Sequence, residues 1–215
     1  MTDSPDSPDS PDSPDSPADE TTPRPRRAAW AGYGAAVWGF LFALPSFYWA
    51  LGGTAGAATT ISPSLVALVE NRVTWFLVVL WVTGVLKVVG GVLGLALVHR
   101  GWGTGMNRLL QFAAWGAGVL LLWHGGLFVL YGLLLRPDIP ETPTELLSVL
   151  RWYTYLWGPW FMIGGLLFIA AARIHLRGLP SLPSLLGRRG AVIAGAIGGT
   201  GALVLSVAMT VMGIG

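Results

Sequence analysis

One lysine lies in the middle of an otherwise apolar run, WVTGVLKVVGGVLG, at residues 81–94. A charged side chain at the centre of a membrane span costs about 3 kcal/mol, and such residues usually face a protein interior or a water-filled cavity and often mark functional sites. None of the long apolar runs in the sequence contains an acidic residue. The charge of Lys87 must therefore be lost, hydrated, or met by a group outside the chain, and Lys87 is our first candidate for ligand binding.

The other candidate residues fall at similar depths in the membrane. Counting 1.5 Å per residue from the same membrane face places Lys87 about 16 Å deep and His124 about 22 Å deep. A lysine stem reaches about 6 Å, so the two side chains can meet. Pro45 interrupts a neighbouring apolar run near the depth of His124, and the segment WGPW at 157–160 approaches that layer from the other face. We predict one ligand-binding pocket, formed by Lys87, His124, Ser46, Tyr48, Trp157 and Trp160.

The sequence offers little for catalysis or metal binding. It contains no cysteine and only three histidines, of which His124 alone lies deep in an apolar run. Without carboxylates in the runs, paired acid/base catalysis and carboxylate-bound metal ions have no ligands there. We therefore predict no catalytic residue, no metal and no cofactor, although an enzyme that uses Lys87 and His124 stays an alternative.

The composition is that of a membrane protein. Of the 215 residues, 53% are hydrophobic and only 11% are charged, whereas a soluble domain carries about 25% charged residues. Five apolar runs are each long enough to cross a bilayer as a helix. They predict an all-α, polytopic transmembrane helix bundle over residues 28–215, with spans at about 30–51, 73–98, 109–135, 152–172 and 191–213.

The chain begins with a segment of different character. Residues 3–17 are five Asp-Ser-Pro repeats, and seven of the eleven acidic residues lie within the first twenty positions. Frequent proline and repulsion between the acids prevent helix formation, and nothing apolar is available for burial. We predict that residues 1–27 form a disordered acidic tail followed by a basic membrane flank.

The arginines predict the orientation in the membrane. Nine of them lie on one side of the predicted spans (Arg24, Arg26, Arg27, Arg100, Arg108, Arg173, Arg177, Arg188 and Arg189), and three lie on the other side (Arg72, Arg136 and Arg151). Because basic residues concentrate in cytoplasmic loops, the N-terminus is predicted to be cytoplasmic and the C-terminus extracytoplasmic.

Glycine spacing predicts how the helices pack. The chain has 30 glycines, and Gly90 with Gly94 and Gly195 with Gly199 have the GxxxG spacing that lets helix backbones approach closely. We expect such contacts mainly within the chain, although a homo-oligomer or another membrane partner stays open. The lipid bilayer is the expected surrounding, and basic residues located between spans do not indicate nucleic-acid binding.

Three stretches carry a resemblance to a known family: GYGAAVWGFLFALPSFYWALGGTAG, WVTGVLKVVGGVLGLALV and RWYTYLWGPWFMIGGLLF. Together they cover roughly residues 28–172, and the chain there resembles an uncharacterised family of small multi-pass bacterial membrane proteins, known as a domain of unknown function. The resemblance implies a helical membrane fold in the bacterial plasma membrane. It implies no reaction, ligand or site residue.

Three functions are open on the sequence alone. The first is binding or transport of a lipid or small anionic amphiphile in a pocket around Lys87 and His124. The second is a structural or regulatory membrane subunit without a ligand, packed through its glycines. The third is a membrane enzyme that uses Lys87 and His124.

Overall fold

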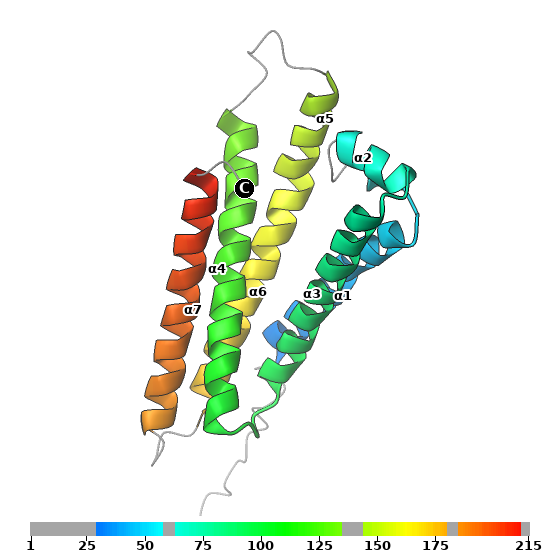
Figure 1. Cartoon of the computed structure of the whole chain (residues 1–215). Coiled ribbons are helices and arrows are strands. Elements are labelled where there is room, and N and C mark those ends of the chain that lie inside the picture. The colour runs from blue at the N-terminus through cyan, green and yellow to red at the C-terminus, as the bar shows by residue number, and fades with distance from the viewer. Residues whose placement is uncertain (1–28, 58–62, 135–143, 180–184, 212–215) are drawn as a thin grey trace, which may run out of the picture.

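The protein is a bundle of helices, as the sequence predicts. The computed structural model describes residues 29–57, 63–134, 144–179 and 185–211, and no strand occurs within these ranges. The predicted tail and basic flank at residues 1–27 lie outside these described residues. The helices are α1 (Trp30–Ala50), α2 (Pro63–Glu70), α3 (Thr74–Val98), α4 (Thr104–Leu134), α5 (Thr144–Trp152), a π-helix (Tyr153–Trp157), α6 (Gly158–Arg177) and α7 (Leu185–Val211) (Figure 1).

The number of membrane spans differs from the prediction by one. Among the described residues, four helical segments are long and apolar enough to cross a membrane: Thr74–Val98, Thr104–Leu134, Leu147–Arg177 and Arg188–Ala208. The predicted first span, α1, is 21 residues long but is not one of the four. Its tryptophans, tyrosines, glycines and proline lower its mean hydropathy, because these residues are less apolar than the leucine and valine of α3. The remaining spans match the predicted ones, although α4 and α7 begin earlier than predicted and α6 ends later, at Arg177.

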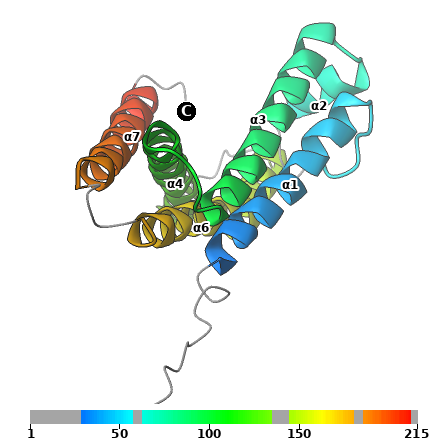
Figure 2. The same cartoon turned by 90° about the horizontal axis from the view of Figure 1, so that it is seen from below.

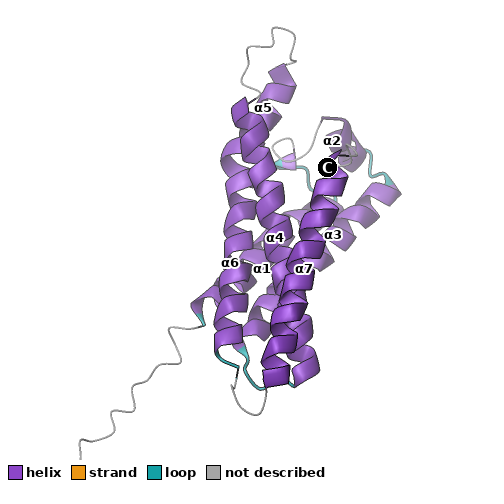
Figure 3. Ribbon diagram, turned by 90° about the vertical axis from the view of Figure 1, so that its left-hand side faces the viewer, coloured by secondary structure: helices purple, strands orange, loops and turns teal. Residues whose placement is uncertain are grey.

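The helices form two groups that α6 connects. In one group α1 packs along α3, and in the other α4 packs against both α6 and α7. Helix α6 also contacts α1, so it joins the groups, whereas α3 and α4 touch only slightly (Figure 2). Figure 3 shows α7 beside α4 on the face away from α1. Residues from α1, α3, α4 and α6 can therefore surround a space between the two groups.

Glycines bring α1 and α3 into backbone contact. A Cβ atom added to Gly39 would lie 2.7 Å from the backbone nitrogen of Gly91, and one added to Gly94 would lie 2.6 Å from the nitrogen of Ala36. Gly90, by contrast, has room for a Cβ, with Phe168 at 3.7 Å as its nearest neighbour. The predicted Gly90–Gly94 pair is therefore half right, because the α1 contact uses positions three apart on α3.

In the α4–α7 contact, too, the closely packed glycines are three residues apart and not four. A Cβ on Gly195 would lie 2.6 Å from the indole of Trp115, and Gly198 packs directly on the backbone of Phe112. Gly199, which completes the predicted GxxxG pair, has ordinary spacing to its neighbours, the nearest at 3.4 Å. One glycine of each predicted pair, Gly94 and Gly195, thus serves a close contact within the chain.

A π-helix connects α5 to α6. The backbone N–H of Gly158 donates to the carbonyl of Tyr153, five residues before it. Pro159 follows at once, and proline has no N–H to donate and crowds the carbonyl four residues earlier. The wider π turn relieves this crowding without ending the helix. The hydroxyl of Thr154 also donates to the carbonyl of Leu150 over 2.7 Å, which satisfies that carbonyl. The chain therefore stays helical through the segment that carries Trp157.

Candidate functional site

The ammonium group of Lys87 has two partners on α1. Its Nζ donates to the hydroxyl oxygen of Ser46 over 2.7 Å and lies 3.8 Å from the ring centroid of Phe42. Phe42 and Ser46 are four residues apart, so they project from the same face of α1. Ser46 is only 2% exposed. The lysine is therefore held by a hydrogen bond and a cation–π contact from the neighbouring helix, both of which favour its charged form.

Lys87 and Ser46 lie in the wall of a cavity of about 270 Å³ between the two helix groups. Its polar lining consists of Ser46, Thr83, Lys87, His124 and Tyr153. The rest of the wall is mainly aromatic, with Phe42, Trp49, Phe128, Trp157 and Phe161, and is completed by Pro45 and Leu80. A single cation in an apolar, aromatic wall suits a ligand that combines an anionic group with a hydrocarbon part.

His124 approaches the cavity from α4 within a cluster of aromatic rings. Its ring centroid lies 4.4 Å from that of Phe128 and 5.1 Å from that of Phe161, both in edge-to-face geometry. Within the described part of the chain, no hydrogen bond to its ring nitrogens is recorded. An imidazole that borders a cavity and is oriented only by ring packing can offer a nitrogen to a ligand or water.

The structure places four of the six predicted site residues around this cavity. Lys87, His124, Ser46 and Trp157 line it. Tyr48 does not, because it is two residues after Ser46 and so points to the other side of α1, where it is 47% exposed and covers Gly53. The sixth residue, Trp160, is partly buried and lies elsewhere for a different reason.

Trp160 lies behind the cavity wall. Three residues after Trp157, it is turned toward α1 and stacks on Trp38, with ring centroids 6.0 Å apart. Its backbone carbonyl accepts a hydrogen bond from the indole of Trp38 over 2.9 Å. Its own buried indole N–H has no hydrogen-bond partner among the described residues. Trp160 therefore joins α6 to α1 and supports the cavity from outside.

The Ser46–Lys87 hydrogen bond is as short as the bond between a nucleophile and its general base in hydrolytic enzymes. Such a pair needs a neutral lysine, an accessible hydroxyl and donors for an oxyanion. Here the ring of Phe42 stabilises the ammonium form, and Ser46 is almost fully buried within a helix. The cavity-lining residues all belong to helices, whose backbone N–H groups are engaged within the helix. The geometry therefore favours binding over nucleophilic catalysis.

A second polar cluster, which the sequence interpretation missed, lies at the other end of the bundle. His175 of α6 is only 1% exposed, with Nδ1 donating to the carbonyl of Leu97 over 2.8 Å and Nε2 2.9 Å from Oδ1 of Asn107. The amide of Asn107 also donates to the carbonyl of Trp102, and Gln111 donates to that of Ala172. Asn107 and Gln111 are four residues apart, and this spacing at the start of α4 is the signal that could have indicated a buried polar face.

The cluster stabilises the end of α3. Leu97 is in the last turn of that helix, where a carbonyl has no intrahelical donor. His175 supplies one from α6, and the indole of Trp102 supplies another to the carbonyl of Ala96 over 2.8 Å. Within the described ranges, no three histidine, aspartate or glutamate side chains gather closely enough to hold a metal ion. This cluster is therefore structural in its geometry.

Comparisons with known proteins identify a family and no activity. No curated protein and no solved structure matches the chain significantly. One family model, described as protein of unknown function (DUF3995), matches residues 39–168, a region that includes every residue lining the Lys87 cavity and leaves out α7. That match covers more than half of the sequence, so this helical membrane protein belongs to the DUF3995 family.

Proposed function

We propose that the protein binds, or carries across the membrane, a small amphiphile or lipid through its anionic group, in the cavity that Lys87 and His124 line. The observation that carries the proposal is the position of the Lys87 ammonium group in the wall of a largely aromatic cavity, held by Ser46 and Phe42. None of the residues that line the cavity is acidic. An anionic group entering the cavity would therefore meet one unneutralised cation in a region of low dielectric constant, where the attraction is strong.

The size of the cavity limits the ligand. Sites for drug-sized molecules have volumes of about 300–1,000 Å³, and this cavity is slightly smaller, at about 270 Å³. It suits the charged group and the first carbons of a single-chain amphiphile, with the rest of the chain lying between the helices or in the bilayer. The whole lining falls within the region that matches the family, which supports a role common to its members.

The test replaces Lys87 by methionine and measures binding of 10-bromodecanoate to the full-length protein in nanodiscs. Bromine quenches indole fluorescence on contact, and Trp49 and Trp157 line the cavity. We expect the substitution to raise Kd about tenfold, because a hydrogen bond to a charged partner contributes about 1.5–3 kcal/mol. The neutral analogue 10-bromodecanol should bind the wild type and the variant with equal, weak affinity.

A matched substitution separates binding from folding. Val89→Met introduces the same side chain on the same helix, at a position 56% exposed and outside the cavity, and should leave Kd unchanged. Ser46→Ala keeps the lysine but removes its hydrogen-bond partner, so it reports on the positioning of the ammonium group. If the wild type does not distinguish the acid from the alcohol, the cavity does not bind an anion. A subunit without a ligand would then be the better hypothesis.

The proposal places the N-terminus of the protein in the cytoplasm of a bacterial cell, with the cavity nearer the outer face. The ends of α3 and α6 and the beginnings of α4 and α7 lie at one end of the bundle, and α2 and α5 lie at the other (Figure 1). Among the described residues, the first end carries Arg100, Arg108, Arg173, Arg177, Arg188 and Arg189, and the second carries Arg72 and Arg151. This asymmetry supports a cytoplasmic location for the end where α1 begins.

Cysteine labelling tests this orientation against a clean background, because the chain has no native cysteine. A cysteine at Asn71, in the exposed turn after α2, should react with a membrane-impermeant maleimide in intact cells. A cysteine at Thr104, exposed at the start of α4, should react only after the membrane is permeabilised. The reverse pattern would show that the chain crosses the membrane in the opposite direction.

A further inference from the structure

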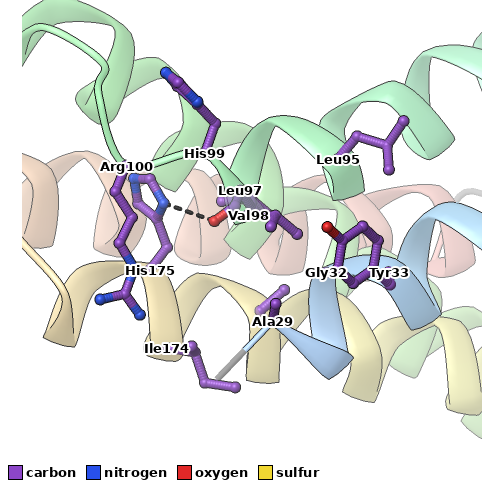
Figure 4. A pocket seen from close by; sticks show the side chains of 11 residues that line it. Ala29, Gly32, Tyr33, Leu95, Leu97, Val98, His99, Arg100, Ile174 and His175 are labelled. Carbon is purple, nitrogen blue, oxygen red and sulfur yellow. Dashed lines mark hydrogen bonds between the residues drawn. The ribbon is translucent and has the colours of Figure 1, made fainter. Parts of the chain in front are cut away.

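A second cavity, of about 910 Å³, lies at the opposite end of the bundle, where α1 begins and α3 and α6 end. Tyr33 lines it from α1, Leu95, Val98 and Arg100 from the end of α3, and Ile174 from α6 (Figure 4). Because α3 and α6 are spanning segments, their ends lie at the level of the lipid headgroups. The cavity is thus placed where a phospholipid could enter from the bilayer.

Arg100 contributes a positive charge to the wall of this cavity. Figure 4 shows its side chain extending along α6 past His175, while His99 points away from the others. A Cβ atom on Gly178 would lie 2.8 Å from the guanidinium carbon, so the guanidinium rests on the glycine that ends α6. The φ angle of Gly178 is −83°, which any residue can adopt, so its lack of a side chain serves to make room for Arg100.

Among the described residues, the guanidinium of Arg100 has no neutralising group nearby. Within the described part of the chain it has no ion-pair or hydrogen-bond partner. The acidic residues in that part are Glu70 and Glu145, which belong to α2 and α5 at the other end of the bundle. Arg173, by contrast, lies 5.5 Å from the ring centroid of Trp115, and Arg108 packs on Gly190. Arg100 is therefore a cation beside a large cavity without a counterion among these residues.

The rest of the wall suits a hydrocarbon chain. Leu95, Val98 and Ile174 present aliphatic surface next to the arginine, and Tyr33 is 54% exposed at the depth where phenol rings favour the membrane interface. Arginine binds phosphate oxygens in a bidentate manner, and basic pockets between helices at the cytoplasmic face are known to hold anionic headgroups.

We propose that this cavity binds an anionic phospholipid, with the phosphate on Arg100 and the first acyl carbons on Leu95, Val98 and Ile174. The site is separate from the Lys87 cavity. It also lies partly outside the region that matches the family, because Tyr33 and Ile174 fall beyond residues 39–168. The proposal therefore concerns this chain and does not depend on a ligand at Lys87.

The test measures binding of phosphatidylglycerol and phosphatidylcholine to the full-length protein in neutral detergent, with native mass spectrometry to count bound lipids. We expect one tightly bound phosphatidylglycerol, whose Kd rises about tenfold in Arg100→Gln, since the substitution removes a charge-assisted hydrogen bond to the phosphate. Arg188→Gln is the matched control, because Arg188 is an exposed arginine at the same end of the bundle and outside the cavity. It should leave Kd unchanged, as should Lys87→Met.

A second variant, Gly178→Ala, keeps the charge of Arg100 but displaces its guanidinium group. Gly178→Ala places a methyl group where the guanidinium rests, so it should also weaken phosphatidylglycerol binding without changing the net charge. Equal losses in Arg100→Gln and Arg188→Gln would show diffuse attraction to the basic face and overturn the proposal. Glycerol phosphate competing as well as the lipid would show that the ligand is a soluble phosphate. Unchanged binding in both Arg100→Gln and Gly178→Ala would remove Arg100 from the site.

Discussion

Gly39→Ala is expected to lower the free energy of unfolding by about 2 kcal/mol, as an overpacked core substitution does. The added methyl group would lie 2.7 Å from the backbone nitrogen of Gly91 and 2.9 Å from its Cα atom. These are backbone atoms, so α1 and α3 would have to separate, and the cavity that both helices line would widen. The measurement is unfolding of the purified protein by sodium dodecyl sulfate in mixed micelles.

Gly90→Ala is the control for this substitution. It makes the same chemical change in α3, but its Cβ would have an ordinary contact of 3.7 Å with Phe168. Because alanine favours the helix over glycine, we expect Gly90→Ala to be neutral or slightly stabilising. If both variants unfolded at the same detergent fraction, α1 and α3 would not be in backbone contact at Gly39.

His175→Leu is expected to cost about 3 kcal/mol, measured by the same unfolding experiment. The substitution keeps a similar volume but leaves the carbonyl of Leu97 and the side-chain oxygen of Asn107 without the ring nitrogens at 2.8 and 2.9 Å. A buried polar group that loses its partner costs about 1–3 kcal/mol. The end of α3 should loosen first, because its last carbonyls depend on donors from elsewhere in the fold.

Two further variants show whether the cost comes from the hydrogen bonds. His99→Leu changes a histidine that is exposed, so it should alter stability by less than about 0.5 kcal/mol. Asn107→Leu combined with His175→Leu removes both members of the side-chain pair, although the carbonyls of Leu97 and Trp102 then lose their donors. The loss of stability in the double variant should therefore be smaller than the sum of the two single losses, because the His175–Asn107 contact is lost only once, and a simple sum would contradict the coupling.

The fold could be predicted from the sequence because helix formation in a membrane depends on local composition. The lengths of the apolar runs predicted α1 and α3 to within about one residue, whereas α4 and α7 begin about five and six residues before the predicted starts. The contacts were harder to predict. Glycine spacing identified Gly94 and Gly195, but the partner positions, Gly91 and Gly198, are three residues away instead of four. Which glycine faces a neighbour depends on the rotation of each helix, which spacing alone does not fix.

Only part of the candidate site could be predicted, because the sequence shows how deep a residue lies but not which way its side chain points. Depth along the helix brought Lys87 and His124 to one level, and both line one cavity. Depth does not indicate direction, so Tyr48 was expected beside Ser46 although it lies on another side of α1. The ring of Phe42 as a partner of the lysine could not be anticipated, because an aromatic residue in an apolar run gives no polar signal. The partners of His175 depend on how α3, α4 and α6 meet.

The π-helix at Tyr153–Trp157 changes the direction in which side chains point on the helix that follows it, relative to the helix before it. A π turn accommodates one extra residue, so the side chains before and after it are offset by about 100° relative to an uninterrupted α-helix. Trp157, the last residue of the π-helix, and Phe161 of α6 line the Lys87 cavity and are thus out of phase with the residues of α5. A relative lacking a single residue in this segment would keep both helices but rotate one against the other. Different side chains would then close the same cavity, so a one-residue deletion here would change the chemistry of the cavity wall without changing the number of helices.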